Sequence, residues 1–176
     1  VHVGAGTTIL AQAYLTGHTT IGRENRIHMG AVLGHEPQDL KFARTRTTYL
    51  RIGDRNVFRE YCTVHRGTEP ASATVIGDDN FLMANAHVGH NCVVGNRVIL
   101  ANAAMLGGHV HVGDRAFLSG HVAVHQFIHI GRLAMLSGQA GLSMDVPPFL
   151  IVAGRNQIHA VNLVGLVPTC ENMPSG

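Results

Sequence analysis

The sequence has no tryptophan, a single lysine, and few aromatic or charged residues. Aromatic side chains make up 5% of the 176 residues, and Asp, Glu, Lys and Arg together make up 14%. The basic side chains are Lys41 and twelve arginines, and the net charge is only +2. Nucleic-acid binders need a concentrated basic surface, so this mild and dispersed charge argues against one. It suits a phosphorylated small substrate or an acidic carrier protein.

Long apolar runs and paired cysteines are also absent. No run approaches the ~20 apolar residues that a membrane-spanning helix needs, so we expect no stable membrane insertion. Cys62, Cys92 and Cys170 have neither disulfide-framework nor zinc-finger spacing. Unpaired thiols fit a reducing compartment, and we expect a cytoplasmic protein.

Bulky aliphatic residues occur at every sixth position. The longest unbroken series is Ile76, Leu82, Val88, Val94, Leu100, Leu106, Val112, Leu118, Val124, Ile130, Leu136 and Leu142. Helices repeat every 3.6 residues and strands every 2, so neither explains a period of six. A solenoid does, because each turn places one large side chain per face into a narrow interior.

Glycine follows one aliphatic in three. The glycines are Gly4, Gly22, Gly53, Gly77, Gly95, Gly113 and Gly131. From Gly77 onward they are 18 residues apart, so three hexads make one turn, and seven glycines predict about seven turns. Glycine tolerates the positive φ expected at a tight corner. We therefore predict an all-β parallel β-helix over residues 1–154, followed by a C-terminal extension over 155–176; twelve consecutive matches make a sandwich with chance spacing improbable.

The six-residue repeat is interrupted twice. Thirteen extra residues lie between Leu33 and Ile52, and six lie between Val64 and Ile76. Both insertions follow the third hexad of a turn, so loops 35–47 and 67–73 leave the same edge of the solenoid. Loops on a rigid scaffold commonly form binding sites.

Five of the thirteen histidines fall near this edge, namely His65, His87, His90, His109 and His125. Three interpretations are open: a metal site, acid–base catalysis with substrate binding, or a structural polar edge. We expect seven of the other eight histidines to be solvated surface residues; they are His2, His18, His28, His111, His121, His129 and His159.

Several short motifs around this edge carry a family resemblance. They are QDLKF at 38–42, VHRGT at 64–68, NAHVGHNC at 85–92, LGGHV at 106–110 and AVHQF at 123–127. In this order they closely resemble the UDP-N-acetylglucosamine O-acyltransferases that begin lipid A synthesis. The resemblance implies a left-handed β-helix, a homotrimer with sites between subunits, and no metal or cofactor.

The resemblance also implies a reaction and residue roles. Family members transfer an R-3-hydroxyacyl chain from acyl carrier protein to the 3-OH of UDP-GlcNAc. His90 is the implied general base, and the Gly108 N–H is the implied oxyanion donor. Gly138 is implied to set acyl length, and its small size favours a long chain. The implied substrate contacts are Gln38, Asp39, Lys41, His65, His87, His109, His125, Gln126 and, near the nucleotide, Asn162.

Two departures from the family pattern affect these expectations. Asn91 follows the implied base where relatives often have Asp, and we expect a slower base. The sequence stops at Gly176 without most of the family's C-terminal helical domain, which predicts weaker binding of the UDP-sugar and the carrier. The alternatives are a related hexapeptide N-acyltransferase, a zinc carbonic anhydrase-like protein, or a catalytically weak truncated homologue.

Overall fold

The protein folds into three parallel sheets of very short strands. The computed structural model describes residues 1–166. The first sheet contains β1 (His2–Val3), β4 (His18–Ile21), β7 (Tyr49–Ile52), β10 (Ala73–Ile76), β13 (Val93–Val94), β16 (His111–Val112) and β19 (His129–Ile130). The third sheet contains β3 (Tyr14–Leu15), β6 (Val32–His35), β9 (Thr63–His65), β12 (His87–Val88), β15 (Met105–Leu106), β18 (Ala123–Val124) and β21 (Gly141–Leu142).

The second sheet is the longest. It contains β2 (Thr8–Ile9), β5 (Arg26–Ile27), β8 (Val57–Phe58), β11 (Phe81–Leu82), β14 (Ile99–Leu100), β17 (Phe117–Leu118), β20 (Met135–Leu136), β22 (Leu150–Ala153) and β23 (Gln157–Val161). Its last strand, β23, pairs antiparallel with β22. The helix α1 (Leu163–Leu166) follows.

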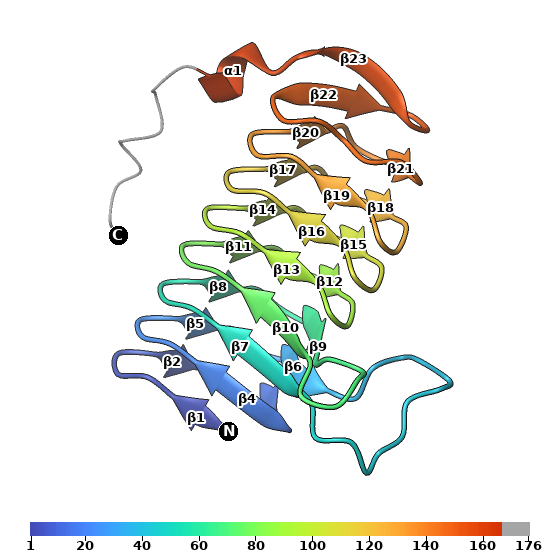
Figure 1. Cartoon of the computed structure of the whole chain (residues 1–176). Coiled ribbons are helices and arrows are strands. Elements are labelled where there is room, and N and C mark those ends of the chain that lie inside the picture. Colours follow the sequence, from blue (N-terminus) through green and yellow to red (C-terminus); the bar gives the residue numbers. More distant parts are fainter. Residues whose placement is uncertain (167–176) are drawn as a thin grey trace.

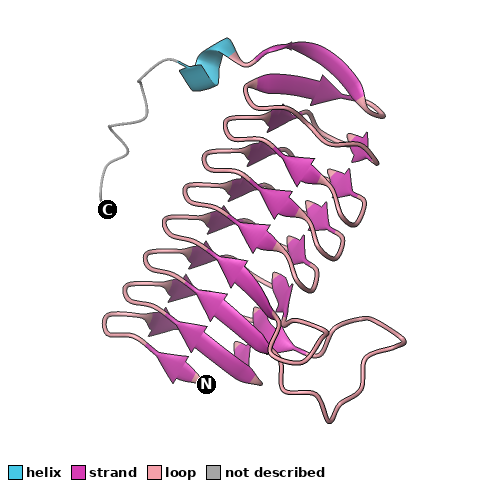
Figure 2. Ribbon diagram, viewed as in Figure 1, coloured by secondary structure: helices cyan, strands magenta, loops and turns pink. Residues whose placement is uncertain are grey.

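The chain visits the three sheets in turn and climbs one strand per visit (Figure 1). The result is a left-handed parallel β-helix of seven complete turns, which confirms the β-helix predicted from the six-residue repeat and the handedness implied by the family resemblance. Apart from the short α1, the described residues are strands and turns (Figure 2). No helix among them has the length and apolar character required to cross a membrane.

The repeated aliphatic residues fill the interior. Leu82, Val88 and Leu100 are fully buried, and the small side chains of Ala86 and Cys92 lie beside them. Each large aliphatic that is buried contributes on the order of 2 kcal/mol. Burial also raises the pKa of the Cys92 thiol to about 12, so this cysteine is an inert core residue.

The glycine edge, between the first and second sheets, is packed more tightly than predicted. The seven repeat glycines do not have positive φ, so that part of the prediction is wrong. They are needed because successive turns touch: a Cβ on Gly77 would lie 2.6 Å from the carbonyl oxygen of Gly95.

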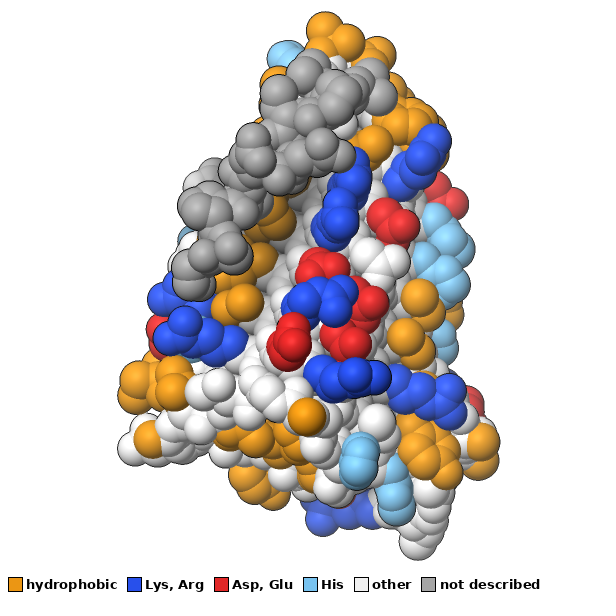
Figure 3. Space-filling model, turned by 90° about the vertical axis from the view of Figure 1, so that its left-hand side faces the viewer, with side chains coloured by type: hydrophobic (Ala, Val, Ile, Leu, Met, Phe, Trp, Pro, Cys, Tyr) orange, Lys and Arg blue, Asp and Glu red, His pale blue; other side chains and the backbone are white. Residues whose placement is uncertain are grey.

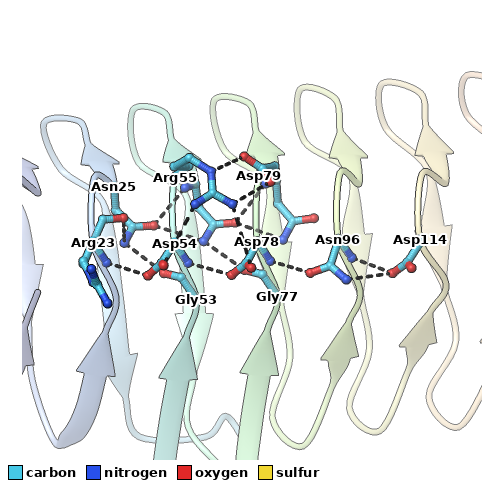
Figure 4. A network of polar contacts seen from close by, with 12 residues as sticks. Arg23, Asn25, Gly53, Asp54, Arg55, Gly77, Asp78, Asp79, Asn96 and Asp114 are labelled. Carbon is cyan, nitrogen blue, oxygen red and sulfur yellow. Dashed lines mark hydrogen bonds and ion pairs between the residues drawn. The ribbon is translucent and has the colours of Figure 1, made fainter. Parts of the chain in front are cut away.

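Two ladders of side chains satisfy the backbone at this edge. Inside, Asn56 Nδ2 donates to Asn25 Oδ1 at 3.0 Å, and Asn80 Nδ2 donates to Asn56 Oδ1 at 2.9 Å. Outside, acidic and basic side chains are interspersed along the surface (Figure 3). There the backbone N–H of Asp54 donates to the Asp78 carboxylate at 2.8 Å, and Arg55 pairs with Asp79 at 2.7 Å (Figure 4).

Both long loops leave the opposite edge. The first connects β6 to β7 and the second connects β9 to β10, so both run from the third sheet to the first. This confirms that the two interruptions of the repeat share one edge. The predicted extension from residue 155 begins with β23 and α1, and its part beyond residue 166 lies outside the described residues.

Candidate active site

Four of the five predicted histidines meet at the edge that carries the loops. His65 ends β9 and its ring lies edge-on to that of His87, with centroids 4.9 Å apart. One turn on, the rings of His90 and His109 are also edge-on, with centroids 5.2 Å apart. The Oγ1 of Thr63 lies 2.7 Å from His87 Nδ1 and fixes that ring. Three successive turns thus build one imidazole cluster, defined here as His65, His87, His90 and His109.

Hydrogen bonds to the neighbouring amide set the tautomer of His90. Its Nδ1 lies 2.9 Å from Asn91 Oδ1. The same oxygen accepts the backbone N–H of Thr68 at 3.1 Å and the Thr68 hydroxyl at 2.8 Å. A backbone N–H only donates, so the atom facing His90 is the amide oxygen. Nδ1 therefore carries the proton, and Nε2 has a lone pair that is free to accept one.

Gly108 lies directly against this ring. A Cβ at Gly108 would overlap Cε1 of His90 and would lie 2.6 Å from Nε2, so any larger residue there would displace the His90 ring. Among residues 1–166 the Gly108 N–H meets no acceptor, whereas its carbonyl accepts the N–H of Phe127 at 3.0 Å. The edge therefore combines an unprotonated ring nitrogen with a free backbone donor.

Burial favours the neutral form of three members of the cluster, His65, His87 and His109. It lowers the pKa of His65 to about 4, and the charges of His87, His35, His90 and Arg66 lower it further. Burial and the charge of His90 also lower the pKa of His87. The pKa of His109 is lowered for the same two reasons, although the Asp39 carboxylate opposes this shift. Neutral imidazoles at pH 7 can accept protons and hydrogen-bond to a sugar.

The first loop lies beside the cluster and is anchored by a buried arginine. Arg66 is 9% exposed and donates to the carbonyl of Gly34 at 3.0 Å and to Thr48 Oγ1 at 3.1 Å. Its guanidinium also lies over the ring of Phe42, 5.5 Å from the centroid. This arginine therefore ties both ends of the loop to the second loop.

The predicted substrate residues of this loop stand at its outer side. Asp39 Oδ1 accepts the backbone N–H of Lys41 at 2.8 Å, which closes a tight turn. Gln38 and Lys41 are exposed, and Asp39 is half-buried. The Asp39 carboxylate acts electrostatically on His109, whose pKa it raises against the opposing effect of burial.

His125 and Gln126 lie one turn beyond the cluster and are exposed. His125 borders a shallow hollow of about 520 Å³ that also touches Gln139 and Arg155. The next residue, Phe127, connects this turn to the cluster, because its ring stacks on His109 with centroids 4.6 Å apart.

The last two predicted residues lie away from the cluster. Gly138 stands at the edge between the second and third sheets, and a Cβ there would be 3.6 Å from the carbonyl oxygen of Gly120. The Asn162 side chain is buried, and it donates to the carbonyl of Leu133 at 2.8 Å and accepts the N–H of Gly165 at 3.1 Å. Their roles in acyl length and nucleotide binding remain predictions.

Sequence reasoning missed several neighbours. Arg66 and Thr68 belong to a motif that matches the family, but the sequence assigned them no role. Phe127 is far from both loops in the sequence, so its contact with His109 could not be predicted. On the first sheet His111 and His129 are exposed as expected, but their rings touch with centroids 4.7 Å apart. They border an apolar hollow of about 500 Å³.

Comparisons with known proteins identify the family to which this fold belongs. Residues 73–108 match the model of the family described as bacterial transferase hexapeptide (six repeats). The solved UDP-N-acetylglucosamine acyltransferase LpxA of Bacteroides fragilis is 33% identical, with a TM-score of 0.86, and the match covers 94% of this chain and 72% of that one.

Two further structures show the same likeness. LpxA of Acinetobacter baumannii is 39% identical with a TM-score of 0.88, and the match covers 94% of this chain and 65% of that one. The Arabidopsis UDP-N-acetylglucosamine acyltransferase is 34% identical with a TM-score of 0.88, and the match covers 97% and 67%. The chain therefore belongs to the UDP-N-acetylglucosamine acyltransferase family.

Proposed function

We propose that the protein transfers an R-3-hydroxyacyl chain from acyl carrier protein to the 3-OH of UDP-GlcNAc, the reaction that begins lipid A synthesis. The observation that carries this proposal is the pairing at one edge of a base and an oxyanion donor. His90 Nε2 is unprotonated because Nδ1 donates to Asn91, and the adjacent Gly108 N–H lacks an acceptor among residues 1–166. An acyl transfer to a hydroxyl needs both groups.

The proposed chemistry follows from these two groups. The sugar 3-OH attacks the thioester carbonyl while His90 Nε2 takes its proton. The carbonyl oxygen becomes an oxyanion and accepts the Gly108 N–H, a contact that contributes on the order of 3 kcal/mol. The intermediate then collapses, the C–S bond breaks, and the imidazolium returns the proton to the leaving thiolate of the carrier.

Other residues of the edge would bind the substrates. Neutral His87 and half-buried Asp39 are suited to hydrogen-bond the sugar hydroxyls. Exposed Lys41 is suited to the donor or its acidic carrier. We propose further contacts from Gln38, His65, His109, His125, Gln126 and Asn162. The donor on acyl carrier protein implies a cytoplasmic protein, and the exposed flat sheets suit a homotrimer whose sites lie between subunits.

We propose that Gly138 leaves room for a long acyl chain. The nearest atom to a Cβ there is a backbone oxygen at 3.6 Å, so larger side chains fit without unfolding the turn. Gly138→Met should shift the preference from long to shorter 3-hydroxyacyl donors in a competition assay. An unchanged preference would remove Gly138 from the acyl groove.

The zinc alternative has no support from the geometry. Within residues 1–166, no group of three or more His, Cys, Asp or Glu side chains is arranged to hold a metal ion. The edge-on contacts of the cluster point ring edges at ring faces rather than at a common centre. Metal analysis of the purified protein, with activity measured after chelation, tests this directly.

The deciding experiment is an acyl-transfer assay on UDP-GlcNAc with 3-hydroxyacyl carrier protein. His90→Ala should lower kcat by about 10³-fold, the contribution typical of a general base. His2→Ala is the matched control, because His2 is exposed in β1 at the far end of the helix. Transfer to UDP-GlcNAc at the wild-type rate by the His90 variant would exclude this mechanism. Transfer to an amino sugar instead would favour the related N-acyltransferase.

A further inference from the structure

The amide of Asn91 has two ends, and only one of them suits a base at His90. With the oxygen toward Nδ1, His90 donates from Nδ1 and leaves Nε2 free. With the NH₂ toward Nδ1, the ring would have to accept there and carry its proton on Nε2. An imidazole in that form cannot take the proton of a hydroxyl. Activity therefore depends on what holds the amide in one orientation.

Contacts of the oxygen alone decide the orientation. Among the residues that the structure describes, Asn91 Nδ2 meets no acceptor, so nothing holds the NH₂ end. The oxygen is held by Thr68, through its hydroxyl at 2.8 Å and its backbone N–H at 3.1 Å. Thr68 is only 4% exposed, so water does not readily replace these bonds. Both donors come from the second loop.

We propose that Thr68 is the positioning residue that locks the Asn91 amide and thereby selects the active tautomer of His90. This inference rests on the proposed role of His90 as the base. It assigns a function to the second loop, which delivers Thr68 onto the turn that carries Asn91. A carboxylate at position 91 would not need this lock, because its two oxygens are equivalent acceptors.

Thr68→Val tests the lock, since it keeps the shape and the backbone N–H but removes the hydroxyl donor. We expect kcat to fall by about tenfold, which corresponds to the loss of one hydrogen bond, with KM unchanged. Thr68→Ser restores the donor and should recover most of the rate. Nitrogen NMR of the His90 ring should show a larger Nε2–H fraction in Thr68→Val than in the wild type.

The Asn91→Asp background separates positioning from a merely structural role. There we expect Thr68→Val to change kcat by less than about threefold, because no amide can turn. An equal loss in both backgrounds with an unchanged tautomer, or no loss in the wild type, would overturn the proposal. The NMR measurement needs no substrate, so it tests the lock even if UDP-GlcNAc is not the acceptor.

Discussion

Gly108→Ala is the sharpest test of how the base and the oxyanion donor are placed. The backbone of Gly108 touches the His90 ring, and a new Cβ would lie 2.6 Å from Nε2 and 3.0 Å from Nδ1. Ordinary carbon–nitrogen contacts are about 3.5 Å, so the ring must move by roughly 1 Å. Gly108 does not have positive φ, so alanine adds no backbone strain.

That movement should cost catalysis far more than stability. A displacement of about 1 Å of a reacting group lowers the rate by roughly 100-fold. His90 is only half-buried and can swing outward, so we expect the free energy of unfolding to change by less than ~1 kcal/mol. The expected result is therefore a variant that is folded but nearly inactive.

The assay is acyl transfer to UDP-GlcNAc, with urea unfolding measured on the same preparations. Gly120→Ala is the matched control, because its Cβ meets only a carbonyl oxygen at 3.5 Å, at a different edge. It should keep both activity and stability. The reasoning fails if Gly108→Ala retains more than about a third of the wild-type kcat, or if Gly120→Ala loses as much activity.

Three further predictions concern the scaffold and the loop. Asn56→Ala leaves the Gly77 carbonyl and the amides of the neighbouring ladder asparagines unpaired, so the free energy of unfolding should fall by at least ~3 kcal/mol. Asn102 is exposed, and Asn102→Ala should leave urea unfolding unchanged. The pKa of His65 is lowered from 6.5 to about 4 in the folded state, so between these pH values the unfolded state binds more protons than the folded state. The free energy of unfolding should therefore fall by about 3 kcal/mol as the pH drops through this window. His65→Gln should flatten this acid limb in denaturation series at several pH values; an unchanged slope would contradict it. Arg66→Lys keeps the charge but loses the planar guanidinium that hydrogen-bonds both ends of the first loop. The KM for UDP-GlcNAc should therefore rise several-fold with kcat nearly unchanged, and an unchanged KM would refute the anchoring role.

The β-helix could be predicted because the six-residue repeat that specifies it is a local sequence pattern. A large side chain at every sixth position specifies three inward-facing residues per turn, and Leu82, Val88 and Val94 are buried as this pattern requires. The sequence also predicted that both loops leave one edge, because each interruption follows the third hexad of its turn. The clustering of His65, His87, His90 and His109 followed from the same phase.

The remaining features depend on contacts between residues that the repeat does not relate. Arg66 bonds the carbonyl of Gly34 across the inserted first loop, and the course of an inserted loop has no period from which this contact could be derived. The glycine corners were assigned correctly, but the wrong cause was given, because the spacing of backbones in successive turns is visible only in three dimensions. Asn162 illustrates the same limit, since its amide bonds to Leu133 across a separation that no motif records.

The stacking of turns also determines which residues lie next to His90, the proposed base. Successive turns place residues 18 positions apart on top of one another, so His90 lies under Gly108, and Asn91 lies under His109 and Phe127. In the proposed mechanism, a side chain on the residue above His90 would occupy the space that the substrate carbonyl needs. Glycine there both opens that space and exposes an N–H toward it. The residue above Asn91 is free to be large, and His109 stacks on Phe127 to close the side of the site. The repeat that builds the core therefore also determines which position next to His90 must be small and which has room for a large side chain.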